Sequence, residues 1–189
     1  NQPSFGFLHE GFLYAAGNKN APHTLYRCTA RTAHHDFATA TTYTYPVFPG
    51  ESERLVMGLS YKGGALLWKY PNGVYVVDTS DANSANWRVI KVGSPGAAGP
   101  ANIVGIEDDI MWVAPDGSWH LISATTATGS VRAEDLTARK LGSFVRDNVN
   151  LAQLASAQLL YYSNKQEVLL GCHGSGQTAK NRRLHLDLN

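Results

Sequence analysis

The stretch EDDIMWVAPDGSWHLI, residues 107–122, decides the fold. Two apolar runs, 110–113 and 119–122, lie on either side of Asp116-Gly117. Asp-Gly between two such runs is a strong hairpin signal, because both central residues of a type I′ turn have a positive φ. The stretch therefore predicts two short antiparallel strands joined by a type I′ turn.

The same pattern occurs three more times in the chain. Pairs of apolar runs separated by polar or Gly-containing turns lie at 11–16 and 24–28, at 65–69 and 74–78, and at 167–172 and 183–188. The four hairpins recur at intervals of about 44 to 58 residues, which is the range of propeller blades. Run 74–78 is apolar apart from its last residue, which predicts a strand that is buried on both faces.

Composition supports an all-β fold with many turns. The chain has 189 residues, of which 43% are hydrophobic and only 16% charged, with 18 Gly. This composition does not fit a helical bundle or a disordered tail. The net charge is +1, and the densest basic groups, Arg139-Lys140 and 180–183, lie beside loops. A nucleic-acid binder carries a basic face, whereas these groups predict solvated surface.

We expect β-propeller-like blades of antiparallel strands, with one short helical insertion near 136–155. The whole of 1–189 is expected to be a single propeller-like domain or fragment, with blade-like units at about 5–45, 54–92, 101–123 and 157–188. The chain opens with Asn1-Gln2-Pro3 and closes within a predicted strand, so we expect a piece of a longer protein, a partial propeller.

The helical insertion is predicted from spacing. Leu141, Phe144, Val145 and Val149 fall at i, i+3, i+4 and i+8, on one face of a helix over 136–150 that Asp135 or Thr137 caps. Residues 151–155 are expected to form a further helical turn.

The two cysteines, Cys28 and Cys172, each lie at the end of a predicted strand. We expect two free, half-buried thiols, although spacing alone leaves a disulfide open. Scarce cysteine indicates assembly in a reducing cytoplasm. No run approaches 18 apolar residues, so no membrane span is expected.

Three clusters of chemically active residues are interpreted as structural. His34-His35-Asp36 has no spacing that points three ligands at one metal ion, and it predicts an exposed loop. Cys172-His173 are sequence neighbours, which make poor nucleophile–base partners. Glu107-Asp108-Asp109 precede a strand and predict a turn. No catalytic, cofactor-binding or metal-binding residue is assigned, no cofactor is expected, and the chain is not predicted to be an enzyme.

Residues 78–87, DTSDANSANW, resemble the Asp-box of sialidase-like propellers through Thr79, Asp81 and Trp87. Asn83 stands at the glycine position, and the tryptophan comes one residue late. In that family the box is a structural turn outside the active site, so the resemblance supports a propeller rather than an enzyme. The arginine triad that binds a sialic carboxylate cannot be assembled from this sequence.

The order of four phrases resembles the propeller proteins of tailed-bacteriophage virions. The phrases are HEGFLYAAG…PHTLYRC, LVMGLSYKGGALLWKYPNGVYVVDTSD, GPANIVGIEDDIMWVAPDGSWHLI, and VRAEDLTARKL…AQLLYYSNKQEVLLGC…NRRLHLDL. They cover about 9–188. One departure is Cys28, which stands where such proteins often carry Ser.

The resemblance implies a structural component of the virion: part of a tail nozzle, a hub or a head-to-tail connector that stabilises packaged DNA. It implies a homo-oligomeric ring around the DNA channel, with portal or adaptor, tail tube or fibre proteins as partners. DNA would make only weak contact, because strong phosphate contacts would retard ejection. The family provides no catalytic residue to transfer.

Two other functions remain open at this point. The runner-up is a carbohydrate-binding or glycan-degrading propeller acting at the host surface, which an exposed Trp or Tyr beside a carboxylate pair would support. The third is a cellular interaction scaffold, whose WD and kelch signatures are not clear in this sequence.

Overall fold

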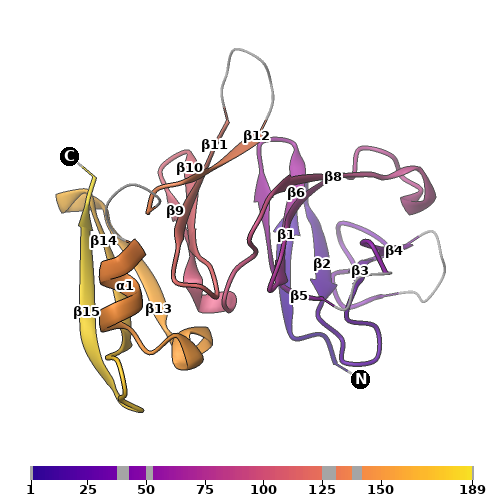
Figure 1. Cartoon of the computed structure of the whole chain (residues 1–189). Coiled ribbons are helices and arrows are strands. Elements are labelled where there is room, and N and C mark those ends of the chain that lie inside the picture. Colours follow the sequence, from indigo (N-terminus) through magenta and orange to yellow (C-terminus); the bar gives the residue numbers. More distant parts are fainter. Residues whose placement is uncertain (1, 38–42, 50–52, 125–130, 138–141, 189) are drawn as a thin grey trace. The chain divides into compact units, whose positions relative to one another are not determined.

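The computed structural model describes residues 2–37, 43–49, 53–124, 131–137 and 142–188. The chain divides into two compact units, Asn1–Ser94 and Pro95–Asn189. Each unit holds two antiparallel sheets (Figure 1), and the units are described one at a time.

The first unit consists of two four-stranded sheets in which the strands follow chain order. The first sheet is β1 (Phe5–His9), β2 (Phe12–Ala16), β3 (Thr24–Arg27) and β4 (Thr44–Pro46). The second is β5 (Arg54–Tyr61), β6 (Gly64–Tyr70), β7 (Val74–Asp78) and β8 (Arg88–Gly93), with the short 3-10 helix η2 (Ser84–Asn86) between β7 and β8.

The second unit also consists of two sheets whose antiparallel strands follow chain order, and it contains helices between them. Its first sheet follows η3 (Pro100–Asn102) and contains β9 (Ile103–Ile106), β10 (Asp109–Val113), β11 (Trp119–Ala124) and β12 (Val131–Asp135). Next come α1 (Gly142–Asn148) and η4 (Leu151–Ser156). The last sheet contains β13 (Gln158–Tyr162), β14 (Glu167–His173) and β15 (Lys180–Asp187), with η5 (Ser163–Lys165) between its first two strands.

The recurring hairpin of the sequence forms the second and third strands of every sheet. The pairs are β2–β3, β6–β7, β10–β11 and β14–β15, all antiparallel. Each sheet is therefore a meander built around one locally encoded hairpin, which is the form of a propeller blade. The predicted fold class, all-β with propeller-like blades and a short helical insertion, is confirmed.

The turn of the organising hairpin differs from the type I′ prediction. Gly117 has a φ of +85°, but Asp116 is not among the residues with positive φ. The Gly117 amide donates to the Ala114 carbonyl at 2.9 Å, and the Ala114 amide donates to the backbone carbonyl of Ser118 at 2.8 Å. Pro115 fixes its own φ at a negative value, so the loop is a type I turn followed by a left-handed glycine.

Two strands were missed by the sequence analysis. The run predicted over 11–16 forms β2, and a further strand, β1, precedes it. The two turn at Glu10-Gly11, both with positive φ. The third sheet does not end at 123, because β12 pairs with β11 from His120↔Asp135 to Ala124↔Val131. β12 is polar, VRAED, whereas β1, FGFLH, is separated from β2 only by the two-residue Glu10-Gly11 turn.

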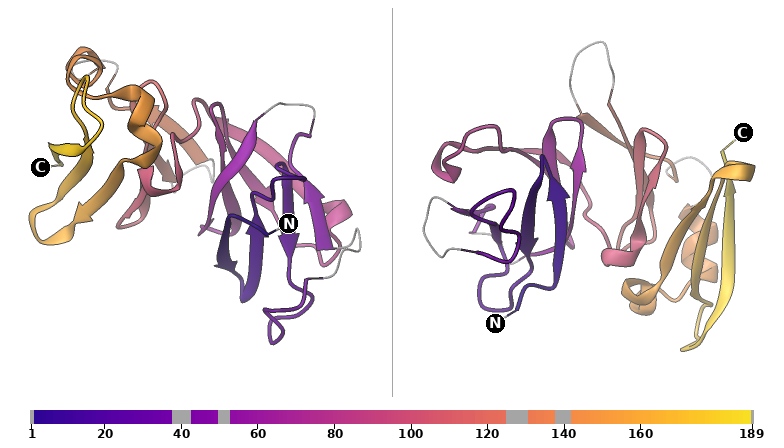
Figure 2. Two further views of the ribbon diagram at one scale, coloured as in Figure 1. Left: turned by 90° about the horizontal axis from the view of Figure 1, so that it is seen from below. Right: turned by 180° about the vertical axis from the view of Figure 1, so that it is seen from behind.

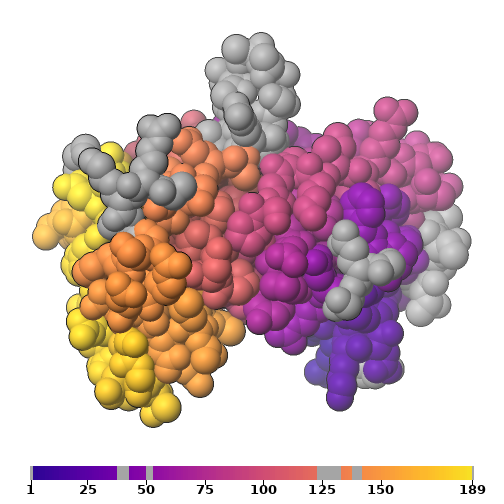
Figure 3. All heavy atoms as spheres, in the orientation of Figure 1, coloured from indigo at the N-terminus to yellow at the C-terminus, as the bar shows by residue number. Residues whose placement is uncertain are grey.

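The helical insertion is shorter than predicted. The helix α1 has seven residues, and the predicted position Leu141 lies outside the described residues. Val145 and Val149 are buried, but Phe144 is 51% exposed, so the predicted apolar face is wrong at this position. In Figure 3 the orange residues of α1 lie at the surface. The expected further helical turn is η4.

The core of the first unit lies between its two sheets, where β1 and β2 contact β5 (Figures 1 and 2). Its buried members are Phe7, Tyr14, Ala16, Leu25, Val47, Leu55, Ala65, Leu67, Tyr75, Val77 and Trp87. Gly58 allows this contact, because a Cβ there would come within 2.4 Å of the Phe7 ring. Strand β7 is buried on both faces apart from Val76 and Asp78, as its apolar sequence predicts.

The core of the second unit joins its two sheets through the helical insertion. Its buried members are Ala98, Ile106, Met111, Val113, Trp119, Val145, Val149, Leu154, Ala157, Leu159, Val168, Leu170 and Cys172. The Gly117 turn packs against this insertion, since a Cβ on Gly117 would lie 2.9 Å from Val145 Cγ1. The β10–β11 hairpin and α1 are therefore one packing unit.

Both thiols are free, and both are fully buried rather than half-buried. Cys28 Sγ accepts a hydrogen bond from the Leu13 amide and donates one to the Ala30 carbonyl, each at 3.2 Å. Burial raises the pKa of Cys172. Within the described ranges, no helix is both long and apolar enough to cross a membrane.

Candidate functional site

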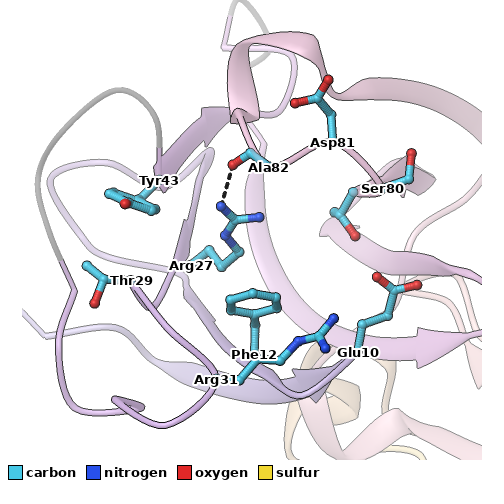
Figure 4. Close-up of a pocket in the computed structure, with 10 residues that line it drawn as sticks. Glu10, Phe12, Arg27, Thr29, Arg31, Tyr43, Ser80, Asp81 and Ala82 are labelled. Carbon is cyan, nitrogen blue, oxygen red and sulfur yellow. Dashed lines mark hydrogen bonds between the residues drawn. The ribbon is translucent and has the colours of Figure 1, made fainter.

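A pocket of about 370 Å³ opens in the first unit, where loops of its two sheets meet (Figure 4). The β1–β2 turn, β2, β3 and the segments beside β3 and β4 form one side, and the loop between β7 and β8 forms the other. The lining residues are Glu10, Phe12, Arg27, Thr29, Arg31, Tyr43, Thr79, Ser80, Asp81 and Ala82.

Arg27 lies at the centre of these residues in Figure 4. It is the last residue of β3, whose alternation places it at an inward position, and it is only 5% exposed. Its guanidinium carbon lies 4.8 Å from the ring centroid of Phe12, 5.3 Å from that of Trp87 and 5.6 Å from that of Tyr43. Three aromatic rings therefore hold a buried cation in one orientation.

The hydrogen bonds of Arg27 leave part of its guanidinium available. Nη2 donates to the Ala82 carbonyl at 2.5 Å. Nε is buried and has no hydrogen-bond partner among the described residues. Burial raises the pKa of Tyr14, and the nearby Arg27 charge opposes this shift. Because Nε is buried, an incoming acceptor would meet the part of the Arg27 side chain that lines the pocket.

A second guanidinium lies at the rim of the pocket. Arg31 is exposed, and its guanidinium carbon lies 5.1 Å from the Phe12 ring centroid. The Phe12 ring therefore contacts two cations at once. His34, which follows Arg31 in the same loop, has its Nε2 3.0 Å from the carbonyl oxygen of Gly11, and this contact ties the loop to the β1–β2 turn.

The two carboxylates of the pocket are in different situations. Asp81 Oδ1 accepts from the Asn83 amide at 2.7 Å, and Oδ2 accepts from Asn86 Nδ2 at 3.0 Å. These hydrogen bonds lower the pKa of Asp81, so the carboxylate stays ionised and is used within its own turn. Glu10 lies on the β1–β2 turn at a φ of +51° and supplies the second carboxylate.

The Asp81 turn is the segment that resembles an Asp-box. Trp87 is 4% exposed, and its Nε1 donates to the Asp81 carbonyl at 2.9 Å. Asn83 Oδ1 accepts from the Ala85 amide at 3.0 Å and caps η2. The segment is a hydrogen-bonded turn, as the resemblance implies, but here its backbone also lines the pocket.

The clusters interpreted as structural are not brought together by the fold. His34, His35 and Asp36 lie on an exposed loop, where Asp36 Oδ2 accepts from Thr29 Oγ1 at 2.8 Å. Glu107 and Asp108 form the turn between β9 and β10. Within the described residues, no group of three or more His, Cys, Asp or Glu side chains is placed to hold a metal ion.

A Ser–His contact in the second unit was missed by the sequence analysis. Ser118 Oγ lies 2.7 Å from His120 Nε2 and donates to Asp116 Oδ1 at 2.6 Å. A hydroxyl has one proton, and this one is directed at Asp116. His120 Nε2 is therefore the donor in the Ser118 contact and cannot act as a base towards it. The cluster is a turn cap rather than an activated nucleophile.

The pocket was also missed, although one signal for Arg27 was present. Its strand, TLYR, places an arginine at an inward position beside aromatic residues, and a buried arginine requires partners. Glu10, Arg27 and Asp81 are far apart in sequence, so only the packing of two sheets brings them together. Most of the aromatic residues predicted in strands are core: Trp68, Trp112, Trp119 and Tyr75 are buried, whereas Tyr161 is partly buried and Tyr162 is 45% exposed.

No protein-family model matches the chain, and no curated protein matches it by sequence. Among solved structures, it is similar to the N-terminal domain of Nup159, with a TM-score of 0.52 and 9% identity over 89% of this chain and 38% of that one. This domain is a β-propeller. The chain thus spans about two fifths of that structure, and the likeness is one of fold alone.

Two weaker similarities involve an S. cerevisiae complex and a human protein. A chain of the complex of Dbp5 with Nup159, Gle1, IP6 and ADP has a TM-score of 0.46 and 11% identity, covering 97% of this chain and 44% of that one. Human WBSCR16 has a TM-score of 0.44 and 10% identity, covering 98% of this chain and 54% of that one.

Proposed function

We propose that the protein is a structural component of a tailed-bacteriophage virion, which forms part of the tail nozzle, hub or head-to-tail connector ring around the DNA channel. Its role is mechanical. Blade-like sheets bury apolar strands, and their loops and edges meet neighbouring subunits and the portal, adaptor, tail tube or fibre proteins.

One observation carries this proposal: the first three phrases that resemble the phage propeller proteins each lie within one sheet, and the fourth runs from the last strand of the third sheet through the fourth sheet. The first phrase contains β2 and β3, the second β5–β7, the third β9–β11 and the fourth β12–β15 together with α1. The first three phrases therefore follow the sheets one by one, and the solved structures that are similar to the chain support the fold only.

Mass spectrometry of density-purified particles from the source lysate tests this proposal. Copy number is measured against the major capsid protein. A small fixed copy number, of the size of one ring, is the expected result. Absence of the protein from purified particles would overturn the proposal.

The pocket favours a second candidate function, a carbohydrate-binding module at the host surface. Tyr43, which is partly exposed, lines the pocket together with the carboxylates of Glu10 and Asp81, and a Tyr near a carboxylate pair is the feature expected of this function. A glycan array probed with the labelled protein tests it. Specific binding that is lost when Glu10 is changed to Gln would support it, and an array without a specific signal would exclude it.

A further inference from the structure

We propose that the pocket of the first unit binds the carboxylate of an acidic sugar, with Arg27 as the central contact and Arg31 at the rim. This inference deepens the second candidate function and rests on it, while it is independent of any place in a virion. Figure 4 shows the groups that would surround the ligand.

The position of Arg27 is the first step. Arg27 is only 5% exposed and has lost most of its hydration. Its charge is compensated here by aromatic faces, one carbonyl oxygen, the Tyr14 side chain and the Asp81 carboxylate. Its Nε–H has no acceptor among the described residues. Guanidinium N–H groups bind carboxylates and phosphates in a fork geometry, so the rings hold Arg27 ready for an oxyanion.

The charges of the pocket select a monoanion. Two guanidinium groups, Arg27 and Arg31, are accompanied by the carboxylates of Glu10 and Asp81. The two positive and two negative side chains balance in charge, so a ligand with one negative charge unbalances the pocket less than a phosphate with two. A singly charged ligand is therefore favoured.

The polar lining selects a hydroxylated ligand. Asp81 is engaged with Asn83 and Asn86, so Glu10 is the carboxylate left to accept hydrogen bonds from a ligand. The exposed Ser80 hydroxyl, which hydrogen-bonds to Asp78, and Thr29 Oγ1, which donates to Asp36, both keep acceptor capacity. Hydroxyl groups next to a carboxylate, as in a uronic acid, fit this arrangement.

Stacking of a neutral sugar is disfavoured by the same geometry. Sugar rings bind to open aromatic faces, but the Phe12 ring carries the guanidinium groups of Arg27 and Arg31, and the Tyr43 ring carries that of Arg27. Recognition must therefore depend on the carboxylate. This distinguishes the pocket from an aromatic platform for uncharged glycans.

Isothermal titration of the purified full chain with D-glucuronate, D-glucose and acetate tests the proposal. We expect D-glucuronate to bind with at least about tenfold higher affinity than either D-glucose, which lacks the carboxylate, or acetate, which lacks the hydroxyls. If acetate bound as tightly as D-glucuronate, the proposal that the ligand is a sugar would be overturned. If D-glucose bound as tightly as D-glucuronate, the proposed carboxylate contact would be overturned.

Variants locate the binding. Arg31→Gln removes the rim guanidinium from an exposed position and is expected to weaken D-glucuronate binding by about tenfold, the effect of one charge-assisted hydrogen bond. Arg54→Gln is the matched control, because Arg54 is also exposed and lies 5.8 Å from the ring centroid of Tyr70, outside the pocket. Equal effects of the two variants would overturn the proposal.

A variant of the central arginine completes the test. Arg27→Lys keeps the charge but removes the planar fork, and we expect it to abolish the preference for D-glucuronate over acetate. Circular dichroism establishes whether the Arg27→Lys variant is folded. If it is not folded, the binding of D-glucuronate to Arg31→Gln and to Glu10→Gln tests the site instead. Folded protein that binds none of the three probes overturns the carboxylate site, and the virion proposal is then unaffected.

Discussion

The indole Nε1 of Trp87 donates a 2.9 Å hydrogen bond to the carbonyl oxygen of Asp81. This contact closes the turn between β7 and β8 and connects the pocket to the core, because Trp87 also lies 6.0 Å from Tyr14 and 5.9 Å from Tyr45 between ring centroids. The turn and the Arg27 site therefore share one buried side chain.

Trp87→Phe is expected to lower the free energy of unfolding by about 1–3 kcal/mol, because it removes this hydrogen bond and part of a buried ring. Urea unfolding followed by circular dichroism measures the change. Trp119→Phe is the control, since Trp119 is equally buried but its Nε1 has no partner within the described residues. A loss for Trp119→Phe as large as for Trp87→Phe would contradict a role for the hydrogen bond.

Gly117→Ala is expected to destabilise the second unit by about 2–4 kcal/mol. The new Cβ would meet Val145 Cγ1 at 2.9 Å and Leu151 Cδ2 at 3.0 Å, at a residue with a φ of +85°. Conformational strain and overpacking both contribute. Thermal unfolding of Gly117→Ala and of the wild-type protein measures the effect.

Gly63→Ala separates these two causes. Gly63 has the same φ of +85°, but a Cβ there would meet nothing within 4 Å. We expect a loss of about 1–2 kcal/mol from strain alone. If Gly117→Ala and Gly63→Ala lost the same free energy of unfolding, the contact between the Gly117 turn and α1 would contribute nothing to the loss.

The sequence predicted the hairpins because they are local. Each is formed by residues less than about twenty positions apart, and apolar alternation with turn residues is sufficient to specify it. The predicted turn type is wrong because Pro115, whose ring fixes its φ at a negative value, occupies the first central position of the turn and places Asp116 at the second. The strand β12 was not predicted because its segment, VRAED, is polar and pairs only as the outer strand of its sheet.

The pocket could not be predicted because it depends on how two sheets pack. Glu10 and Arg27 come from the first sheet of the unit, and Asp81 comes from a loop of the second. No periodicity within one strand relates these residues. Arg27 could have been noticed as a charged residue at an inward strand position, but its aromatic partners Phe12, Tyr43 and Trp87 come from three other segments.

The second unit is expected to lose stability below about pH 6.5, the ordinary pKa of histidine. Burial lowers the pKa of His120, while the Asp135 and Asp116 carboxylates oppose the shift. The ring stacks on Trp112 at 5.1 Å between centroids. Because the unfolded chain binds a proton first, stability is complete above pH 6.5 and falls as the pH decreases towards the lowered pKa of the folded state.

Urea unfolding at pH 7.5, 6.5 and 5.5 measures this dependence. His120→Gln is expected to flatten it for the second unit. Burial also lowers the pKa of His9, so His9 gives the stability of the first unit a pH dependence of the same sign. His9→Gln is therefore measured in parallel. Exposed His35 provides the control, and an equal flattening by His35→Gln would contradict the assignment.

Both thiols are expected to resist modification in the native protein. Cys28 and Cys172 are 0% exposed, and burial raises the pKa of Cys172, which lowers its thiolate fraction near pH 8. Reaction with a disulfide reagent should be about a thousandfold slower than in denaturant, because it requires opening of the fold. Ser163→Cys places a thiol at an exposed position on η5 and should react at once. Fast reaction of one native thiol would show that its sheet opens locally, and one label per chain followed by mass mapping identifies which sheet.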